Sequence, residues 1–201
     1  KGFNLRTTAG IDYAQKQQRI FTLPIDNGNV ANPENAVEAK QEHWTKWMWN
    51  AVATYNMEIG KHRADYMLGM ELNRQSDVWF SGKRYDYEIL NPDYMWPDAG
   101  TGVEKAYGSG SGYSLVSFFG KANYTYADKY MASVTVRRDG SSRFGKSNQY
   151  GTFPSISLGW RLTQESFMEK TSNWLTDLKL RASWGQTGNQ AIDNNAQFGL
   201  Y

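Results

Sequence analysis

The chain has no cysteine, and only 5 of its 201 residues are proline. Neither a disulfide framework nor thiol chemistry is therefore open to it. Its net charge of +2 is too small to indicate a nucleic acid or an anionic membrane surface as a partner. No apolar run approaches the roughly eighteen residues that a membrane-spanning helix needs. What remains is a chain of negative mean hydropathy, −0.69, that is rich in aromatic residues.

Strict alternation of apolar and polar residues predicts strands, because successive side chains of a strand point to opposite faces. The clearest pair is residues 153–162 and 177–185, joined by a capped single helical turn at residues 163–170. The pattern predicts an all-β, antiparallel architecture of seven strands; the other five are residues 3–13, 47–59, 64–72, 116–126 and 130–137. Residues 196–201 have the pattern of a further strand.

The expected connections alternate between short and long. Gly60-Lys61 and residues 127–129 are tight turns, and residues 163–176 form a compact one. The long connections are expected to be polar loops, at residues 15–42, 74–112, 139–152 and 186–195, with a flexible Gly-Ser end at residues 108–112. Outer-membrane barrels combine short periplasmic turns with long extracellular loops. The four long loops are therefore predicted to be extracellular.

The position of charge favours a membrane barrel over a soluble β-sandwich, although both alternate. Charge on a lipid face costs about 2–4 kcal/mol for Arg or Lys at the midplane. In each strand the charges fall on the polar parity, which predicts these lumen-facing residues: Arg6, Asp12, Glu58, Arg63, Asp65, Glu71, Lys121, Arg161, Lys179 and Arg181. The other parity is crowded with large residues and predicts these lipid-facing ones: Trp47, Trp49, Tyr55, Tyr66, Leu68, Phe118, Val134, Leu158, Trp160 and Leu180.

Trp47 and Trp49 admit two interpretations. They are either part of an interfacial aromatic girdle or a platform on which sugar rings stack. Their shared lipid-facing parity favours the girdle.

One run of motifs resembles a known family. It reads FPSISLGWR from Phe153, then Glu165 and Phe167 in an E-x-F turn, then LKLRASWGQTGNQ from Leu178. This run is similar to the late barrel region of SusC/RagA-type transporters, the TonB-dependent outer-membrane importers of Bacteroidetes. The resemblance is dense over residues 113–192 and looser over residues 1–112, where only strand pattern and aromatic content agree.

The resemblance implies a cell outer-membrane location and an incomplete arc of a 22-stranded barrel. Residues 1–201 would be part of the C-terminal barrel domain, without the plug domain. It further implies a SusD-like surface lipoprotein, TonB acting through the plug, outer-membrane lipid, and an oligosaccharide or peptide substrate as partners. As an excised arc with two open strand edges, the chain is not expected to fold stably alone.

The loop expected at residues 74–112 holds the candidate contacts for a ligand or for the lipoprotein lid. Aromatic faces next to carboxylates suit a glycan or a peptide, and the candidate residues are Tyr85, Tyr87, Asp93, Tyr94 and Trp96. A loop that packs only on itself explains the same residues equally well.

Catalytic and metal sites are not expected. His43 and His62 are predicted at opposite ends of one strand, at its extracellular end and at a periplasmic turn, too far apart to share a metal. Asp93, Asp98 and Glu104 do not have the spacing of an EF-hand calcium loop. We therefore expect no enzyme activity and no cofactor.

Two alternatives to an importer barrel stay open. One is a small self-contained outer-membrane barrel of about eight strands, whose interior is filled by side chains. The other is a soluble all-β carbohydrate-binding module, which dependence on detergent would exclude.

Overall fold

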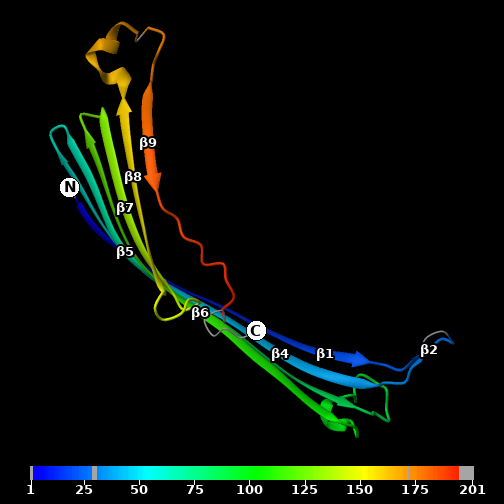
Figure 1. Ribbon diagram of the computed structural model, residues 1–201. Helices are drawn as coiled ribbons and strands as arrows, with labels where there is room; N and C mark the ends of the chain where they lie inside the picture. The colour runs from blue at the N-terminus through cyan, green and yellow to red at the C-terminus, as the bar shows by residue number, and fades with distance from the viewer. Residues whose placement is uncertain (1, 29–30, 172, 195–201) are drawn as a thin grey trace. The chain divides into compact units, whose positions relative to one another are not determined.

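The computed structural model describes residues 2–28, 31–171 and 173–194. Seven strands form one sheet in the order β1-β4-β5-β6-β7-β8-β9, so each strand pairs with its neighbours along the chain (Figure 1). Their bounds are β1 Gly2–Thr22, β4 Ala36–Ile59, β5 His62–Tyr85, β6 Glu104–Tyr126, β7 Tyr130–Ser141, β8 Tyr150–Arg161 and β9 Lys179–Gly185. A small hairpin of β2 (Ile25–Asp26) and β3 (Ala31–Asn32) lies between β1 and β4. Within the described residues the sheet is open, with β1 and β9 at its edges.

All seven predicted strands are present, but four of them are much longer than predicted. β1, β4, β5 and β6 each continue into segments that were expected to be loops. The connection expected at residues 15–42 is confined to residues 23–35, and that expected at residues 74–112 is confined to residues 86–103.

The Gly-Ser segment at residues 108–112 was also expected to be a flexible loop end, and it is part of β6. Its glycines allow β5 to approach closely: a Cβ on Gly112 would lie 2.7 Å from the Gln75 carbonyl oxygen. The segment is therefore a close strand contact, for which glycine is suited.

The two turns that join β4 to β5 and β6 to β7 are tight, as predicted. Gly60 has a φ of 59°, in the left-handed region, and the consecutive residues Ala127 and Asp128 have φ values of 52° and 57°. Such conformations are typical of two-residue hairpin turns. They fix the register of the two hairpins β4–β5 and β6–β7.

The connection between β8 and β9 departs from the predicted alternation of loop lengths. It contains the expected helical turn, in the form of two 3-10 segments, η2 (Leu162–Gln164) and η3 (Ser166–Thr171). However, it extends over residues 162–178, whereas the connection between β7 and β8 covers only residues 142–149. Loop length alone therefore does not distinguish the two ends of this sheet. The further strand predicted at residues 196–201 lies outside the described residues.

The chain forms two compact units, which share the four long strands. The first comprises the described residues of 1–10, 47–74 and 113–201, and the second comprises those of 11–46 and 75–112. The first holds β7, β8 and β9 together with parts of β1, β4, β5 and β6. The second holds the remainder of those four strands with residues 86–103 and the β2–β3 hairpin.

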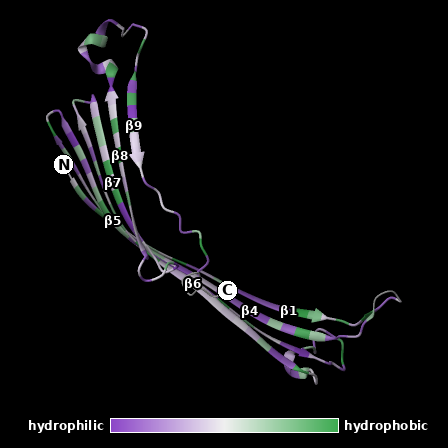
Figure 2. Ribbon diagram, viewed as in Figure 1, coloured by the Kyte–Doolittle hydropathy of each residue, from purple (hydrophilic) through white to green (hydrophobic). Residues whose placement is uncertain are grey.

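In the first unit one face of the sheet is apolar and the other is polar. Paired residues of antiparallel strands project to the same face. Tyr130 pairs with Trp160, and Leu158 pairs with both Ala132 and Ala182. On the other face Ser157 pairs with Ser133 and Ser183. Hydrophobic and hydrophilic residues accordingly mix along each strand (Figure 2).

The register of the long strands stays constant from end to end. On β5 and β6, Leu68 lies beside Gly120, and Phe80 lies beside Gly108 the same number of residues further along both strands. On β1 and β4, the Trp49 indole donates to Thr7 Oγ1, and Tyr13 lies opposite His43 in the same register. Odd-numbered and even-numbered residues of each long strand therefore stay on the same faces along its length.

Glu165 ties the turn end of the sheet together. Its Oε1 accepts from the Tyr130 hydroxyl at 2.7 Å and from the Trp160 indole at 3.1 Å, while Oε2 accepts from Lys129 Nζ at 3.1 Å. These hydrogen bonds, that from Tyr130 foremost, lower the pKa of Glu165 to about 2. Glu165, the first residue of the E-x-F turn, therefore joins the start of β7 to the end of β8 through hydrogen bonds.

Replacing Glu165 with Gln should lower the unfolding temperature of the full-length protein at pH 7, because Gln carries no charge to accept from Lys129. The pKa of Glu165 is depressed on folding, so its contribution is complete above the unfolded value near 4.3 and is lost as pH falls toward 2. Thermal unfolding in detergent across this pH range measures the effect. The difference in unfolding temperature between E165Q and wild type should become smaller below pH 4. Glu88→Gln, a change at an exposed loop residue, should leave the unfolding temperature unchanged. If E165Q and wild type unfolded at the same temperature at pH 7, the stabilising role of Glu165 would be refuted.

Candidate functional site

Residues 86–103 fold over the ends of β1 and β4 in the second unit and enclose a small core. Val37, Tyr87 and Met95 are buried there, with Phe21 packed against them. The Tyr87 backbone N–H donates to Asn35 Oδ1 at 2.6 Å, and the Tyr87 hydroxyl donates to the Trp96 carbonyl at 3.0 Å. Burial raises the pKa of the Tyr87 phenol. Tyr87, a candidate ligand contact from the sequence, is 5% exposed and serves the packing of the loop.

Tyr94 and Trp96 are the aromatic residues that this loop presents to solvent, at 65% and 54% exposure. Trp96 is held by Arg19 of β1, whose guanidinium carbon lies 4.0 Å from the centroid of the indole. Arg19 Nη1 also donates to the Pro92 carbonyl at 3.2 Å. A guanidinium stacked on an indole is a favourable cation–π contact. Arg19 therefore anchors the loop while leaving much of the Trp96 ring accessible.

The structure does not gather the five candidate residues into one site. Tyr85 ends β5, where Lys83 and Lys105 lie 4.6 and 5.0 Å from its ring centroid. Lys83 is itself paired with Glu34 at 3.1 Å. Asp93 is exposed in the loop. Tyr85 is therefore part of a lysine cluster, separate in its contacts from Tyr94 and Trp96.

A hollow of about 320 Å³ lies beside Trp96, within the second unit. Phe80 and Trp96 supply aromatic surface to it, and Arg19 supplies a guanidinium. The remaining lining residues are Gln17, Gln18, Ala39, Lys40 and Gln41. Sequence reasoning missed this site because it assigned residues 15–42 to a loop. The signal was the row Gln15, Gln17, Arg19 and Phe21, whose alternate spacing continues that of the preceding strand.

The polar face of the first unit carries ion pairs near the turns. Arg63 lies 3.6 Å from Glu58 and 3.3 Å from Asp128, and Arg161 lies 3.5 Å from Asp177. Strand pairing puts Arg181 on this face, opposite Gly159, and puts Lys179 opposite Arg161. These pairs are partly exposed, so each contributes at most about 1 kcal/mol. The face is therefore a mixed-charge surface.

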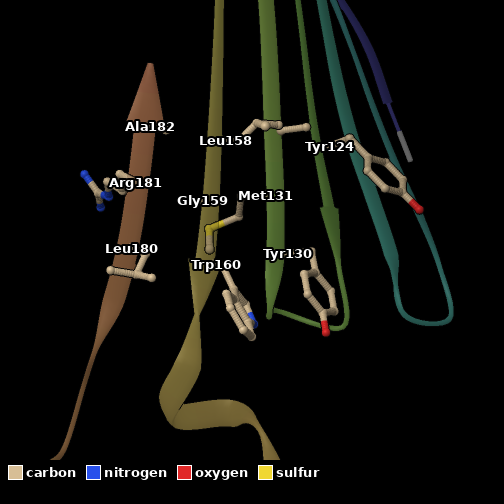
Figure 3. Close-up of a pocket in the computed structure, with 10 residues that line it drawn as sticks. Tyr124, Tyr130, Met131, Leu158, Gly159, Trp160, Leu180, Arg181 and Ala182 are labelled. Carbon is tan, nitrogen blue, oxygen red and sulfur yellow. The ribbon is translucent and has the colours of Figure 1, made fainter.

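The apolar face ends near the turns in a row of aromatic rings. The rings of Tyr126 and Tyr130 are stacked with centroids 6.5 Å apart, and those of Tyr130 and Trp160 are 6.4 Å apart. Figure 3 shows Tyr130 and Trp160 side by side on neighbouring strands, with Leu158 further along β8 and Leu180 on β9. The shallow depression that these residues line is continuous with the apolar face.

His43 was predicted to lie at a strand end. It lies within β4 instead, because that strand begins at Ala36 and continues past it. The Nδ1 atom of His43 lies 3.1 Å from the Tyr13 hydroxyl oxygen. His62 is the first residue of β5, and its Nδ1 atom lies 2.6 Å from the Tyr124 hydroxyl oxygen. Among residues 2–28, 31–171 and 173–194, no three His, Asp or Glu side chains are grouped to hold a metal ion. The same residues include no helix with the length and hydropathy to cross a membrane.

Replacing Tyr87 with Phe should loosen residues 86–103 without disturbing the sheet. The substitution removes the hydrogen bond to the Trp96 carbonyl, which is worth about 0.5–1.5 kcal/mol. Limited proteolysis of the full-length protein should then cut this loop about two to ten times faster than in wild type, as that energy implies. Tyr94→Phe is the matched control, because the Tyr94 ring is exposed; equal cleavage of Tyr87→Phe and wild type would contradict the packing role.

Comparison with known proteins accounts for this architecture. Residues 2–199 match the family model described as TonB dependent receptor-like, beta-barrel. The TonB-dependent receptor SusC of Bacteroides thetaiotaomicron is 35% identical over 98% of this chain, and the TonB-dependent receptor P39 of Formosa agariphila is 30% identical over all of it. In each case the match covers 19% of the relative, so the chain spans about a fifth of the length of these relatives.

A solved structure, that of the RagAB peptide transporter, superposes on 96% of the chain with a TM-score of 0.85 and 26% identity, and the match covers 22% of that protein. The SusC/RagA resemblance is thus confirmed, and the soluble-module interpretation is excluded. The relatives are outer-membrane proteins of Bacteroidetes, and so is this chain. The chain belongs to the β-barrel family of TonB-dependent receptors.

Proposed function

We propose that this chain forms part of the barrel wall of a nutrient importer in the outer membrane. The observation that carries the proposal is an apolar band on one parity of the strands. On the four long strands this band extends over Phe3–Tyr13 on β1, Trp47–Ile59 on β4, Ala64–Leu72 on β5 and Val116–Tyr126 on β6. Each stretch has about 9 to 13 residues, and a tilted strand needs about 9–11 to cross a bilayer.

The two ends of the band support its placement in the hydrocarbon. At the turn end lie the stacked rings of Tyr126, Tyr130 and Trp160, and Trp47 and Trp49 lie at the other end of the band on β4. Aromatic residues concentrate at both membrane interfaces of barrels. The predicted girdle role of Trp47 and Trp49 agrees with this placement.

The opposite parity is proposed to line the lumen. It carries the ten charged residues predicted for it, and in the first unit several of them form the ion pairs described above. A charge there is hydrated, whereas on the lipid side it would cost about 2–4 kcal/mol at the midplane. The twenty residues assigned to the two sides divide without exception by strand parity.

The partners and substrate are proposed for the full-length protein. SusC and the RagAB transporter are receptors or transporters of this kind, and RagAB is described as a peptide transporter. By that relationship the full-length protein would take up oligosaccharides or peptides, with a SusD-like lipoprotein at the cell surface and TonB acting through a plug domain. The exposed Tyr94 is the best candidate in this chain for contact with the lipoprotein, because it is accessible and forms no part of the loop core.

Single cysteines in the full-length protein should report the two faces of β5. Tyr66→Cys and Leu68→Cys should react with a lipid-soluble maleimide, because their parity is apolar. Asp65→Cys should react instead with a membrane-impermeant thiol reagent that enters the lumen. Labelling that failed to alternate between positions 65 and 66 would place the strand in the wrong register or outside the bilayer.

Tyr94→Ala should weaken capture of the lipoprotein or of nutrient, with assembly of the barrel intact. An exposed aromatic side chain at an interface contributes about 1–2 kcal/mol or more, which corresponds to a loss of affinity of about fivefold to thirtyfold. Uptake and co-purification of the lipoprotein are the measurements, with Glu88→Ala in the same loop as the control. Wild-type values for Tyr94→Ala would limit this loop to packing.

A further inference from the structure

A cavity of about 330 Å³ lies within the first unit, where β7 ends and β8 begins. Its lining includes Ser117, which pairs with Asp139, and Asp139 pairs in turn with Gly151. Arg137 and Phe153, also in the lining, pair with each other. All five residues have the odd parity that marks the polar face of these strands. By the proposed placement of the barrel this face borders the lumen, so the cavity lies on the lumen side of the wall.

The segment that follows β9 forms one wall of this cavity, and two sets of contacts hold it there. Gly188 lies so close to the Phe153 ring that a Cβ on it would be 2.2 Å from the nearest ring carbon. Arg143 donates from Nη1 to the Gln190 carbonyl at 3.1 Å and from Nε to Asn194 Oδ1 at 2.7 Å. Glycine at position 188 permits the close approach. The wall is therefore built by specific contacts between this segment, β8 and the connection before β8.

The cavity carries one negative charge that has no counterion. Its charged lining residues are Glu71, Arg137 and Asp139. Asp139 neutralises Arg137, whose Nε lies 2.7 and 2.9 Å from the two carboxylate oxygens. Glu71 accepts from the Asn73 amide at 2.5 Å, but no Lys or Arg in the part of the chain that the structure describes pairs with it. Glu71 is half-buried, and a carboxylate withdrawn from water favours a cationic partner.

The rest of the lining suits a basic side chain on a peptide. The rings of Phe144, Tyr150 and Phe153 line the cavity, and aromatic faces attract cations. The two connections that line it also supply amide groups, which can bond to the N–H and C=O groups of a peptide backbone: Asn148, Gln149, Asn189 and Gln190. A neutral oligosaccharide could bond to these amides but offers no cation to Glu71. The charge of the cavity therefore distinguishes between the two proposed substrate classes.

We propose that this cavity binds a lysine or arginine side chain of a transported peptide, and that Glu71 determines this specificity. The inference rests on the proposed function, because it requires that the polar face border the lumen of an importer. It narrows the substrate to peptides with a basic side chain. The ammonium or guanidinium group would donate to Glu71 Oε2, and the aromatic rings would pack against the aliphatic part of the same side chain.

The test uses the full-length protein in detergent and blocked pentapeptides that differ only in a central Arg, Gln or Glu. Affinity is measured by isothermal titration calorimetry. The wild type should bind the Arg peptide about tenfold more tightly than the Gln peptide, the effect of a charge-assisted hydrogen bond. Glu71→Gln should reduce this preference to about twofold or less. Asp65→Asn is the matched control, because Asp65 lies on β5 with the same parity as Glu71 but outside the lining, so it should leave the preference unchanged.

Two further variants separate specificity from a loss of folding. Glu71→Asp keeps the charge on a shorter side chain, so it should retain part of the preference for the Arg peptide. Glu71→Lys should reverse the order, so that the Glu peptide binds more tightly than the Arg peptide. The unfolding temperature of each variant shows whether the barrel is intact. A wild-type preference in both Glu71→Gln and Glu71→Lys would overturn the proposal, and so would a wild type that binds none of the three peptides.

The other outcomes identify a different occupant or a failure of the proposed function. A neutral maltooligosaccharide that displaced the Arg peptide as well as a second copy of that peptide would assign the cavity to sugars and overturn the proposal. A lower unfolding temperature of Glu71→Gln with an unchanged peptide preference would assign it to a cation of the same full-length chain, with the same result. If the cysteines at positions 66 and 68 label from lipid but peptide preference does not depend on Glu71, only this inference fails; if they do not label, the proposed function fails first.

Discussion

The structure depends on one constraint, which is that strand parity must hold over long strands so that charge stays off the apolar band. A register slip of a single residue would exchange the faces, placing Asp65 and Arg63 where Tyr66 and Ala64 lie. The apolar contacts of one face and the hydration of the other both favour the same register. The tight turns at Gly60 and at Ala127–Asp128 set that register at one end. The pairing then continues without a change of register to the far ends of β5 and β6.

The same constraint explains where apolar side chains give way to polar ones along the long strands. The apolar band ends at Tyr13, Trp47, Leu72 and Val116, each within three residues of the boundary between the two compact units. Beyond these positions the residues of the same parity no longer have to be apolar, and amides and Arg19 appear among them. At the other end, Glu165 bonds the Tyr130 and Trp160 side chains where the band meets the turns. The polar tips of Tyr130 and Trp160 are thus hydrogen-bonded while their rings remain on the apolar face.

The sequence was sufficient to predict the strands wherever a bilayer imposes alternation. The faces of β6 to β9 and the helical turn before β9 follow directly from the residues. The outer parts of β1, β4, β5 and β6 were not predicted, because neither parity is consistently apolar there and the period-two signal is weak. The Gly-Ser segment at residues 108–112 was misleading for the same reason: a flexible composition is held in a strand by its pairing with β5.

The candidate loop was predicted only in part. Tyr94 and Trp96 are exposed, whereas Tyr87 is buried and Tyr85 contacts two lysines; a ligand role for any of them stays a prediction. Nothing in the spacing of Tyr87 reveals that Asn35, distant in sequence, bonds to its backbone. Arg19 was missed because the anchor of Trp96 comes from a strand that the sequence assigned to a loop. Such contacts depend on which distant segments meet, and a local pattern does not contain that information.

Nitroxide scanning along β6 tests the central claim most directly. Spin labels would be placed one at a time at positions 106, 110, 114, 116, 118, 122 and 124 of the full-length protein in lipid, which leaves out the glycines that β5 approaches closely. Collision rates with oxygen and with a water-soluble nickel complex would be compared. The account predicts that oxygen dominates at positions 116–124 and that the nickel complex dominates at positions 106 and 110, with the change near position 114. A profile without a change at that point, or with the nickel complex dominant at Phe118, would contradict it.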